Sequence, residues 1–234
     1  MSDKLTYLVG SNFYNLNTPT SDKDYIQFIF PSKEDLYKGI FISKRTKDEK
    51  GNDITIKDIR LLIKGLRKGS LQMFEVLYSE TLECINPFND FYMTNEYLKR
   101  YRDDLVRNQR GELLKAIQGE LTNRYKKFKS ENTVKEYVHC CKLIWLFYQL
   151  NGGNNPFKLI LEKDYLATDY FDHYKNLRLN CNSFKDIDDY VDRKEGLENH
   201  YNDVKSTVIE INTNKSSLEI IESIFFSEVF AIVC

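Results

Sequence analysis

The sequence lacks the features that mark several protein classes. None of its apolar runs approaches the roughly 20 residues that cross a bilayer, and no secretory apolar region follows Met1. Cys-x-x-Cys pairs are absent and the five cysteines are an odd number, which argues against a disulfide framework and a thiolate zinc site. The three histidines lie too far apart for a His-Glu-x-x-His zinc motif. We therefore expect a cytoplasmic protein that has no contact with a membrane.

An excess of charge of either sign is also missing. The chain has 34 basic and 35 acidic residues, a net charge of -1 and a pI near 6.3. Such a balance provides no chain-wide positive field that attracts nucleic acid, so any anion site must form locally. The 41% of hydrophobic residues is enough for the packed core of one large domain or two small ones among 234 residues.

Short apolar runs separated by turn residues are typical of strands in the first third of the chain. The pattern predicts strands at residues 5–9, 25–30, 40–43 and 71–77. Between the last two, Thr55 begins a capping-box pattern, which predicts a helix from Ile56 to Lys68 that Gly69 closes.

Longer helical periods begin at Thr94 and predict a helical bundle for the rest of the chain. A proline between asparagines interrupts both periods at 86–90, so we place the domain boundary there. The sequence thus predicts an α+β fold with a mixed sheet and helices in residues 1–88 and a helical domain in residues 89–234.

Paired carboxylates stand at the start of the second predicted strand. The period of two places Asp22 and Asp24 on one face, with Lys23 on the other. At about 4 Å and an effective dielectric constant near 20, two ionised carboxylates repel by on the order of 4 kcal/mol. The pair therefore favours a shared proton or a divalent cation, and hard oxygen ligands favour magnesium or manganese (Mg2+ or Mn2+).

An Asp-x-Asp pair is common by chance, and Asp186 and Asp188 form a second one. The first pair differs in its context. An apolar strand ends at Gly10 and Ser11, ten residues separate Ser11 from Asp22, and another strand follows Asp24. A Gly-Ser turn lets backbone N–H groups and a hydroxyl approach a phosphate.

Further candidates lie outside this motif. Glu75 stands within an apolar predicted strand, where a metal site resolves the cost of burying its charge. Lys64 belongs to the basic face of the predicted 56–68 helix, and a second basic cluster spans residues 124–129. His139 and Lys142 share one face of a helix as candidate substrate contacts. Solvated faces and core packing are the alternative interpretations of these charged residues and of the abundant aromatic residues.

The Gly-Ser turn, the Asp-x-Asp pair and the later carboxylate together resemble the signature of the DNA polymerase beta-like nucleotidyltransferase superfamily. The stretch from Gly10 to Asp24, with its Tyr, Leu, Thr-Pro and Ser21-Asp-x-Asp layout, is similar to the bacterial and phage branch of predicted nucleotidyltransferases that includes the RNA-repair-associated polymerase beta-like proteins. Later landmarks of that branch are also present, at 68–69, 86–87, 139–142 and 152–157. The chain departs from its relatives at Lys142, where they usually carry Arg, at Ser70, where they often carry Asn, and after Asp24, where an Arg-Gly is missing.

The resemblance implies roles for these residues. Asp22, Asp24 and Glu75 would be catalytic and hold Mg2+ or Mn2+, and Gly10 and Ser11 would bind the phosphates of an NTP. Candidate substrate contacts are Ser21, Lys64, His139 and Lys142.

The implied reaction transfers a nucleoside monophosphate from the NTP, such as ATP, to a hydroxyl of an RNA end, a protein or a small molecule, and releases pyrophosphate. A catalytically silent nucleotide- or RNA-binding module of the same fold, in phage or mobile-element defence, is the alternative. A third hypothesis is an interaction protein built on the helical half. Which NTP, which acceptor and which oligomeric state apply stays open.

Overall fold

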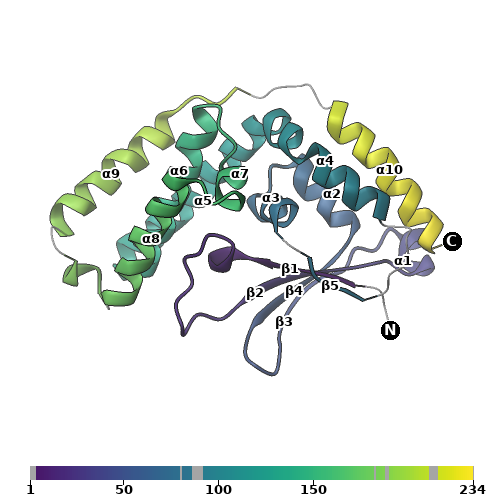
Figure 1. Ribbon diagram of the computed structural model, residues 1–234, viewed down its shortest axis with the longest axis horizontal. Coiled ribbons are helices and arrows are strands. Elements are labelled where there is room, and N and C mark those ends of the chain that lie inside the picture. Colours follow the sequence, from purple (N-terminus) through teal and green to yellow (C-terminus); the bar gives the residue numbers. More distant parts are fainter. Residues whose placement is uncertain are drawn as a thin grey trace.

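The computed structural model describes residues 4–79, 81–85, 92–181, 183–187, 190–210 and 216–233 (Figure 1). The fold is α+β: a mixed sheet forms one layer, and most of the helices lie together on one side of it. Within this part of the chain, no helix combines the length and the apolar composition that a membrane span requires. The predicted domain boundary at 86–90 lies outside the described residues.

The sheet has five strands in the order β3-β4-β2-β1-β5. Their bounds are β1 Lys4–Val9, β2 Asp24–Ile29, β3 Ser43–Lys47, β4 Asp53–Asp58 and β5 Thr81–Ile85. β2 and β4 are parallel and the other pairs are antiparallel. Alternate residues of the central strands, such as Val9, Ile26 and Phe28, are buried under the helices, as the period of two requires. The strands predicted at 5–9 and 25–30 are confirmed.

Three short helices lie between the strands, and the longer helices come after β5. The first third contains the short helices α1 Lys33–Lys38, α2 Arg60–Arg67 and α3 Leu71–Tyr78, and a 3-10 turn, η1, at Gly10–Asn12. Of these, α2 and α3 contact the sheet at β4 and β1. The helical layer continues through α4 Tyr92–Asn108, α5 Arg110–Glu131, α6 Val134–Asn151 and α7 Pro156–Leu161, and its outer side is formed by α8 Tyr165–Asn180, η3 Phe184–Asp186 and α9 Tyr190–Ser206. α10 Ser216–Val233 lies along α4. The predicted helical second half is confirmed.

Three predicted elements are wrong. Residues 71–77 form the helix α3 instead of a strand, because a short apolar run that is buried on nearly every side has no periodicity that separates the two. The predicted helix at 56–68 begins only at Arg60. The residues before it complete β4, and the Asp58 carboxylate, instead of Thr55, accepts the Arg60 N–H at 2.9 Å. The strand predicted at 40–43 begins at Ser43, after a loop.

Candidate active site

A cleft of about 580 Å³ opens at the edge of the sheet where β1 ends and β2 and β4 begin. The sheet, η1 and α3 supply one wall, and α5 and α6 supply the other. Seven of the predicted site residues line it: Gly10, Ser11, Asp22, Asp24, Glu75, His139 and Lys142. The fold therefore brings residues up to 132 positions apart in the sequence, from 10 to 142, into one hollow.

Two predicted substrate contacts lie elsewhere. Ser21 shapes the loop before β2, where its hydroxyl accepts the Thr18 N–H at 2.9 Å. Lys64 lies on α2 with its ammonium group 3.4 Å from the centroid of the Phe41 ring. Neither side chain lines the cleft.

Gly10 lies between two of the candidate carboxylates. Its φ is +68°, and a Cβ at this position would lie 2.6 Å from the Asp24 Oδ2 atom. Its N–H donates to the Glu75 Oε2 atom at 3.1 Å. Only glycine combines this backbone conformation with so close an approach to Asp24. The turn is thus fixed between β2 and α3.

Asp24 is in an acidic setting. Partial burial, followed by the charges of Asp22 and Asp53, raises the pKa of Asp24, while Lys135 and Lys142 oppose this rise. Asp53 is the partner of Asp24 in the parallel register of β2 and β4. Mutual repulsion among hard oxygen ligands is what a divalent cation relieves, so this donor set fits Mg2+ or Mn2+.

A protein-only metal cage is not formed in the described part of the chain. No group of three or more His, Cys, Asp and Glu side chains there is arranged to hold a metal ion. Magnesium is commonly held by one or two carboxylates together with phosphate oxygens of a substrate. Asp22 and Asp24 fit this second mode.

Glu75 lies behind the turn, on the buried face of α3, with 4% of its surface exposed. Burial raises the pKa of Glu75, against the lowering effect of Lys142, the Gly10 N–H and the Tyr14 hydroxyl. The Lys142 ammonium group lies 4.4 Å from the centroid of the Tyr14 ring. The predicted role of Glu75 as a metal ligand stays a prediction, and the geometry provides a second role, which is to hold the Gly10 backbone.

The opposite wall of the cleft is mainly basic, because four cations outnumber the carboxylates of Glu120 and Glu136: Arg124, Lys127, Lys135 and Lys142. Glu136 of α6 is almost fully buried and accepts hydrogen bonds from the Lys127 ammonium at 2.8 Å and the Arg124 guanidinium at 3.3 Å, which holds both cations of α5 at the cleft. Burial, then the charges of Lys142 and Arg124, lowers the pKa of His139 to about 2. His139 is therefore a neutral hydrogen-bonding group in the physiological range.

Among the charged residues of the cleft, sequence reasoning missed four: Arg45, Asp53, Glu120 and Glu136. A signal for Asp53 was present, because the Gly51-Asn52 turn is followed by the alternation of a strand. We did not use this signal, because Thr55 was interpreted as the start of a helix and not as part of a strand. Arg45 and Glu136 carry no local signal, since the pairing of β3 with β4 and the packing of α5 on α6 bring them to the cleft.

Comparisons with known proteins leave the family open. No protein-family model matches the sequence, and no curated protein is significantly similar to it. Among solved structures, the chain is similar to a nucleotidyltransferase-like protein from Exiguobacterium sibiricum 255-15, with 12% identity and a TM-score of 0.39 over 99% of this chain and 85% of that chain. So distant a similarity transfers no residue roles. The function has to be argued from the side chains of the cleft.

Proposed function

We propose that this chain is a metal-dependent nucleotidyltransferase that moves a nucleoside monophosphate from an NTP to a hydroxyl acceptor. One observation carries the proposal: a single cleft contains a Gly-Ser turn, the carboxylates of Asp22 and Asp24, and a facing wall of cations. Paired carboxylates with cations opposite them match the needs of a triphosphate bound together with a divalent cation.

In the reaction, the acceptor oxygen forms a bond to the α-phosphorus while the bond from that phosphorus to the bridging oxygen breaks. Pyrophosphate leaves, and the proton of the acceptor hydroxyl passes to a carboxylate of the acidic wall. Such transfers depend mainly on positioning and on the neutralisation of charge that develops on the attacking and leaving oxygens. A cation bound by Asp22 and Asp24 would supply that neutralisation at the phosphates.

The protein groups have separate tasks. Because the Gly10 N–H is engaged with Glu75 and Asp24 fills the space over Gly10, the Ser11 hydroxyl is what the turn offers to a phosphate. Arg124 and Lys127, held by Glu136, bind the outgoing pyrophosphate from the opposite wall. His139 contributes a neutral hydrogen bond to the substrate.

The first test measures pyrophosphate release and nucleotide labelling with each of the four NTPs, in Mg2+ and in Mn2+, with total RNA or cell lysate as the acceptor. Asp24→Asn removes a charged cation ligand with little change in shape. We expect it to lower the rate by at least roughly a hundredfold, the order seen when one preorganised electrostatic group is lost. Asp192→Asn on the exposed surface of α9 is the matched control and should keep the wild-type rate.

Two results would overturn the proposal. Equal rates in Asp24→Asn and the wild type would show that the paired carboxylates do no chemistry. Nucleotide binding without pyrophosphate release in either metal would identify a silent nucleotide-binding module.

A further inference from the structure

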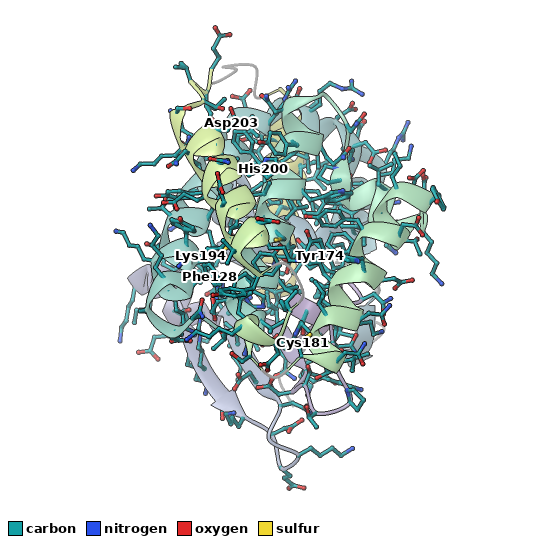
Figure 2. The ribbon with its side chains drawn as sticks, turned by 90° about the vertical axis from the view of Figure 1, so that its left-hand side faces the viewer. Phe128, Tyr174, Cys181, Lys194, His200 and Asp203 are labelled. Carbon is teal, nitrogen blue, oxygen red and sulfur yellow. The ribbon has the colours of Figure 1, made fainter. Side chains whose placement is uncertain are left out.

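A second hollow, of about 240 Å³, adjoins the cleft. It lies where the loop before β2 meets the beginning of α6 and the end of α8, and we refer to it as the α6–α8 recess. Thr18, Thr133, Lys135, Arg178 and Cys181 line it, with Val134. Figure 2 shows Cys181 at the lower end of the helical layer, above the sheet. Lys135 lines both hollows, so the recess and the cleft share a wall.

The recess contains a cation whose burial is not offset by a counterion. Arg178 is half-buried, and its guanidinium donates to the Leu16 carbonyl. Among the described residues, no carboxylate forms an ion pair with Arg178 or with Lys135, and burial lowers the pKa of Arg178 with no opposing charge. Removing a guanidinium from water without a partner is costly, and its remaining N–H groups need acceptors. An anionic ligand resolves both costs.

The other lining groups favour phosphate as that anion. Thr133 is the N-cap of α6, and Thr18 places a second hydroxyl at the recess, 2.9 Å from the Ser21 hydroxyl. A guanidinium, an ammonium and hydroxyls are the groups with which proteins bind the several oxygens of a phosphate. Lys135 lines both hollows, so an anion bound in the recess lies beside the cleft that contains the candidate catalytic carboxylates.

We propose that the α6–α8 recess binds a phosphate group of the acceptor, so that the acceptor is a phosphate ester whose hydroxyl enters the cleft. This inference rests on the proposed nucleotidyl transfer. It assigns the triphosphate to the space between the Gly10–Ser11 turn and the cations Arg124 and Lys127, and the acceptor to the end of the cleft at Lys135. A polynucleotide end and a small phosphorylated metabolite both have a hydroxyl next to a phosphate ester, whereas an unmodified protein side chain has a hydroxyl without a phosphate.

The kinetic test compares three acceptors under identical conditions: an RNA trinucleotide with a free 3′ hydroxyl, glycerol 3-phosphate, and unphosphorylated glycerol. Lys135→Met is the main variant, because Lys135 is exposed and we expect its substitution to leave the fold intact. We expect it to raise the KM of the preferred phosphate-bearing acceptor at least tenfold while the KM of the NTP changes little. Arg178→Lys, which keeps the charge, should have a smaller effect. Lys126→Met on the exposed surface of α5, away from both hollows, should behave as the wild type.

The three acceptors also separate the sources of the phosphate. Preference for the trinucleotide identifies a polynucleotide acceptor, and preference for glycerol 3-phosphate identifies a small phosphate ester. Equal use of glycerol and both esters, or transfer that is insensitive to Lys135→Met and Arg178→Lys, overturns the assignment of the recess while the proposed reaction stands.

A binding experiment keeps the two proposals distinguishable if no transfer is detected. Glycerol 3-phosphate is titrated into the 15N-labelled chain with a saturating non-hydrolysable NTP analogue, and the amides of Thr133, Val134 and Lys135 are followed. Saturable chemical-shift changes, with an apparent Kd for glycerol 3-phosphate that Lys135→Met raises at least fivefold, support phosphate binding in the recess even if the chain transfers no nucleotide. If glycerol 3-phosphate shifts these amides only when the analogue is left out of the sample, the NTP itself occupies the recess and the proposal is overturned.

Discussion

Gly10 shows how one residue connects the parts of the candidate site. Its N–H is bonded to Glu75 on α3, and its α-carbon faces Asp24 on β2. Glu75 therefore determines where the turn lies relative to the cation ligands, even without touching a metal ion. A positioning carboxylate and a metal-binding carboxylate respond differently to loss of their charge.

We expect Glu75→Gln to keep most of the transfer activity, because the amide oxygen still accepts the Gly10 N–H. Glu75→Ala should lose activity and about 1 kcal/mol of stability, since the partly buried Gly10 N–H loses its acceptor. The pKa of Glu75 is raised in the folded state, so the wild type loses stability as the pH rises from the ordinary carboxyl range through that raised value. The melting temperature of Glu75→Gln minus that of the wild type should therefore be larger at pH 8 than at pH 5. If Glu75→Gln instead abolishes activity and weakens Mg2+ binding, Glu75 is a metal ligand.

Among the elements, α8 holds the loop before β2 in place, although the two segments are far apart in the sequence. Asn15, whose φ is +55°, donates from Nδ2 to the Asp172 carboxylate at 3.0 Å and accepts from the Lys175 ammonium at 2.8 Å. The backbone carbonyl of Leu16 accepts from Arg178. The loop between the Gly-Ser turn and Asp22 is thus attached to a helix of the second half.

Asn15→Gly tests this attachment, because glycine adopts the same backbone conformation and lacks both side-chain bonds. A typical intramolecular hydrogen bond contributes about 0.5–1.5 kcal/mol, and loss of that free energy from the bound state lowers kcat/KM for the NTP by about two- to thirteenfold. The steady-state rate measured over a range of NTP concentrations gives this value. Asp169→Asn on the exposed side of α8 is the control. An unchanged kcat/KM in Asn15→Gly would mean that the loop keeps its position without α8.

At the scale of the molecule, the sequence predicted the elements with a regular period and missed those that depend on tertiary contacts. The alternation in β1 and β2 and the long periods of α5 and α6 were sufficient to place them. The apolar run of α3 was ambiguous because it is buried on almost all sides. The cleft was predicted on its acidic side, where Gly10, Asp22 and Asp24 are near in sequence. On its basic wall the sequence offered His139 and Lys142, but the position of this wall and of the α6–α8 recess depends on how α5, α6 and α8 sit on the sheet, which no local pattern specifies.

The placement of α5 on the first half depends on a close backbone contact at Gly69, the residue between α2 and α3. Its φ is +66°, and a Cβ there would lie 2.3 Å from the Glu112 carbonyl carbon of α5. Gly51 in the β3–β4 turn has a φ of +83° with nothing within 4 Å, so alanine there meets backbone strain alone. Because Gly69→Ala adds a backbone clash to the same strain, we expect it to lower the free energy of unfolding by at least about 1 kcal/mol more than Gly51→Ala.

Urea unfolding of both variants measures this difference, and NTP transfer measured beside it shows whether the cleft changes. Gly69→Ala displaces the helix that carries Arg124 and Lys127, so its kcat/KM should fall even under conditions where the chain stays folded. Gly51→Ala leaves α5 in place and should keep the wild-type value. Equal stability and activity in the two variants would show that α5 is positioned by its side-chain contacts and that the basic wall does not depend on the Gly69 turn.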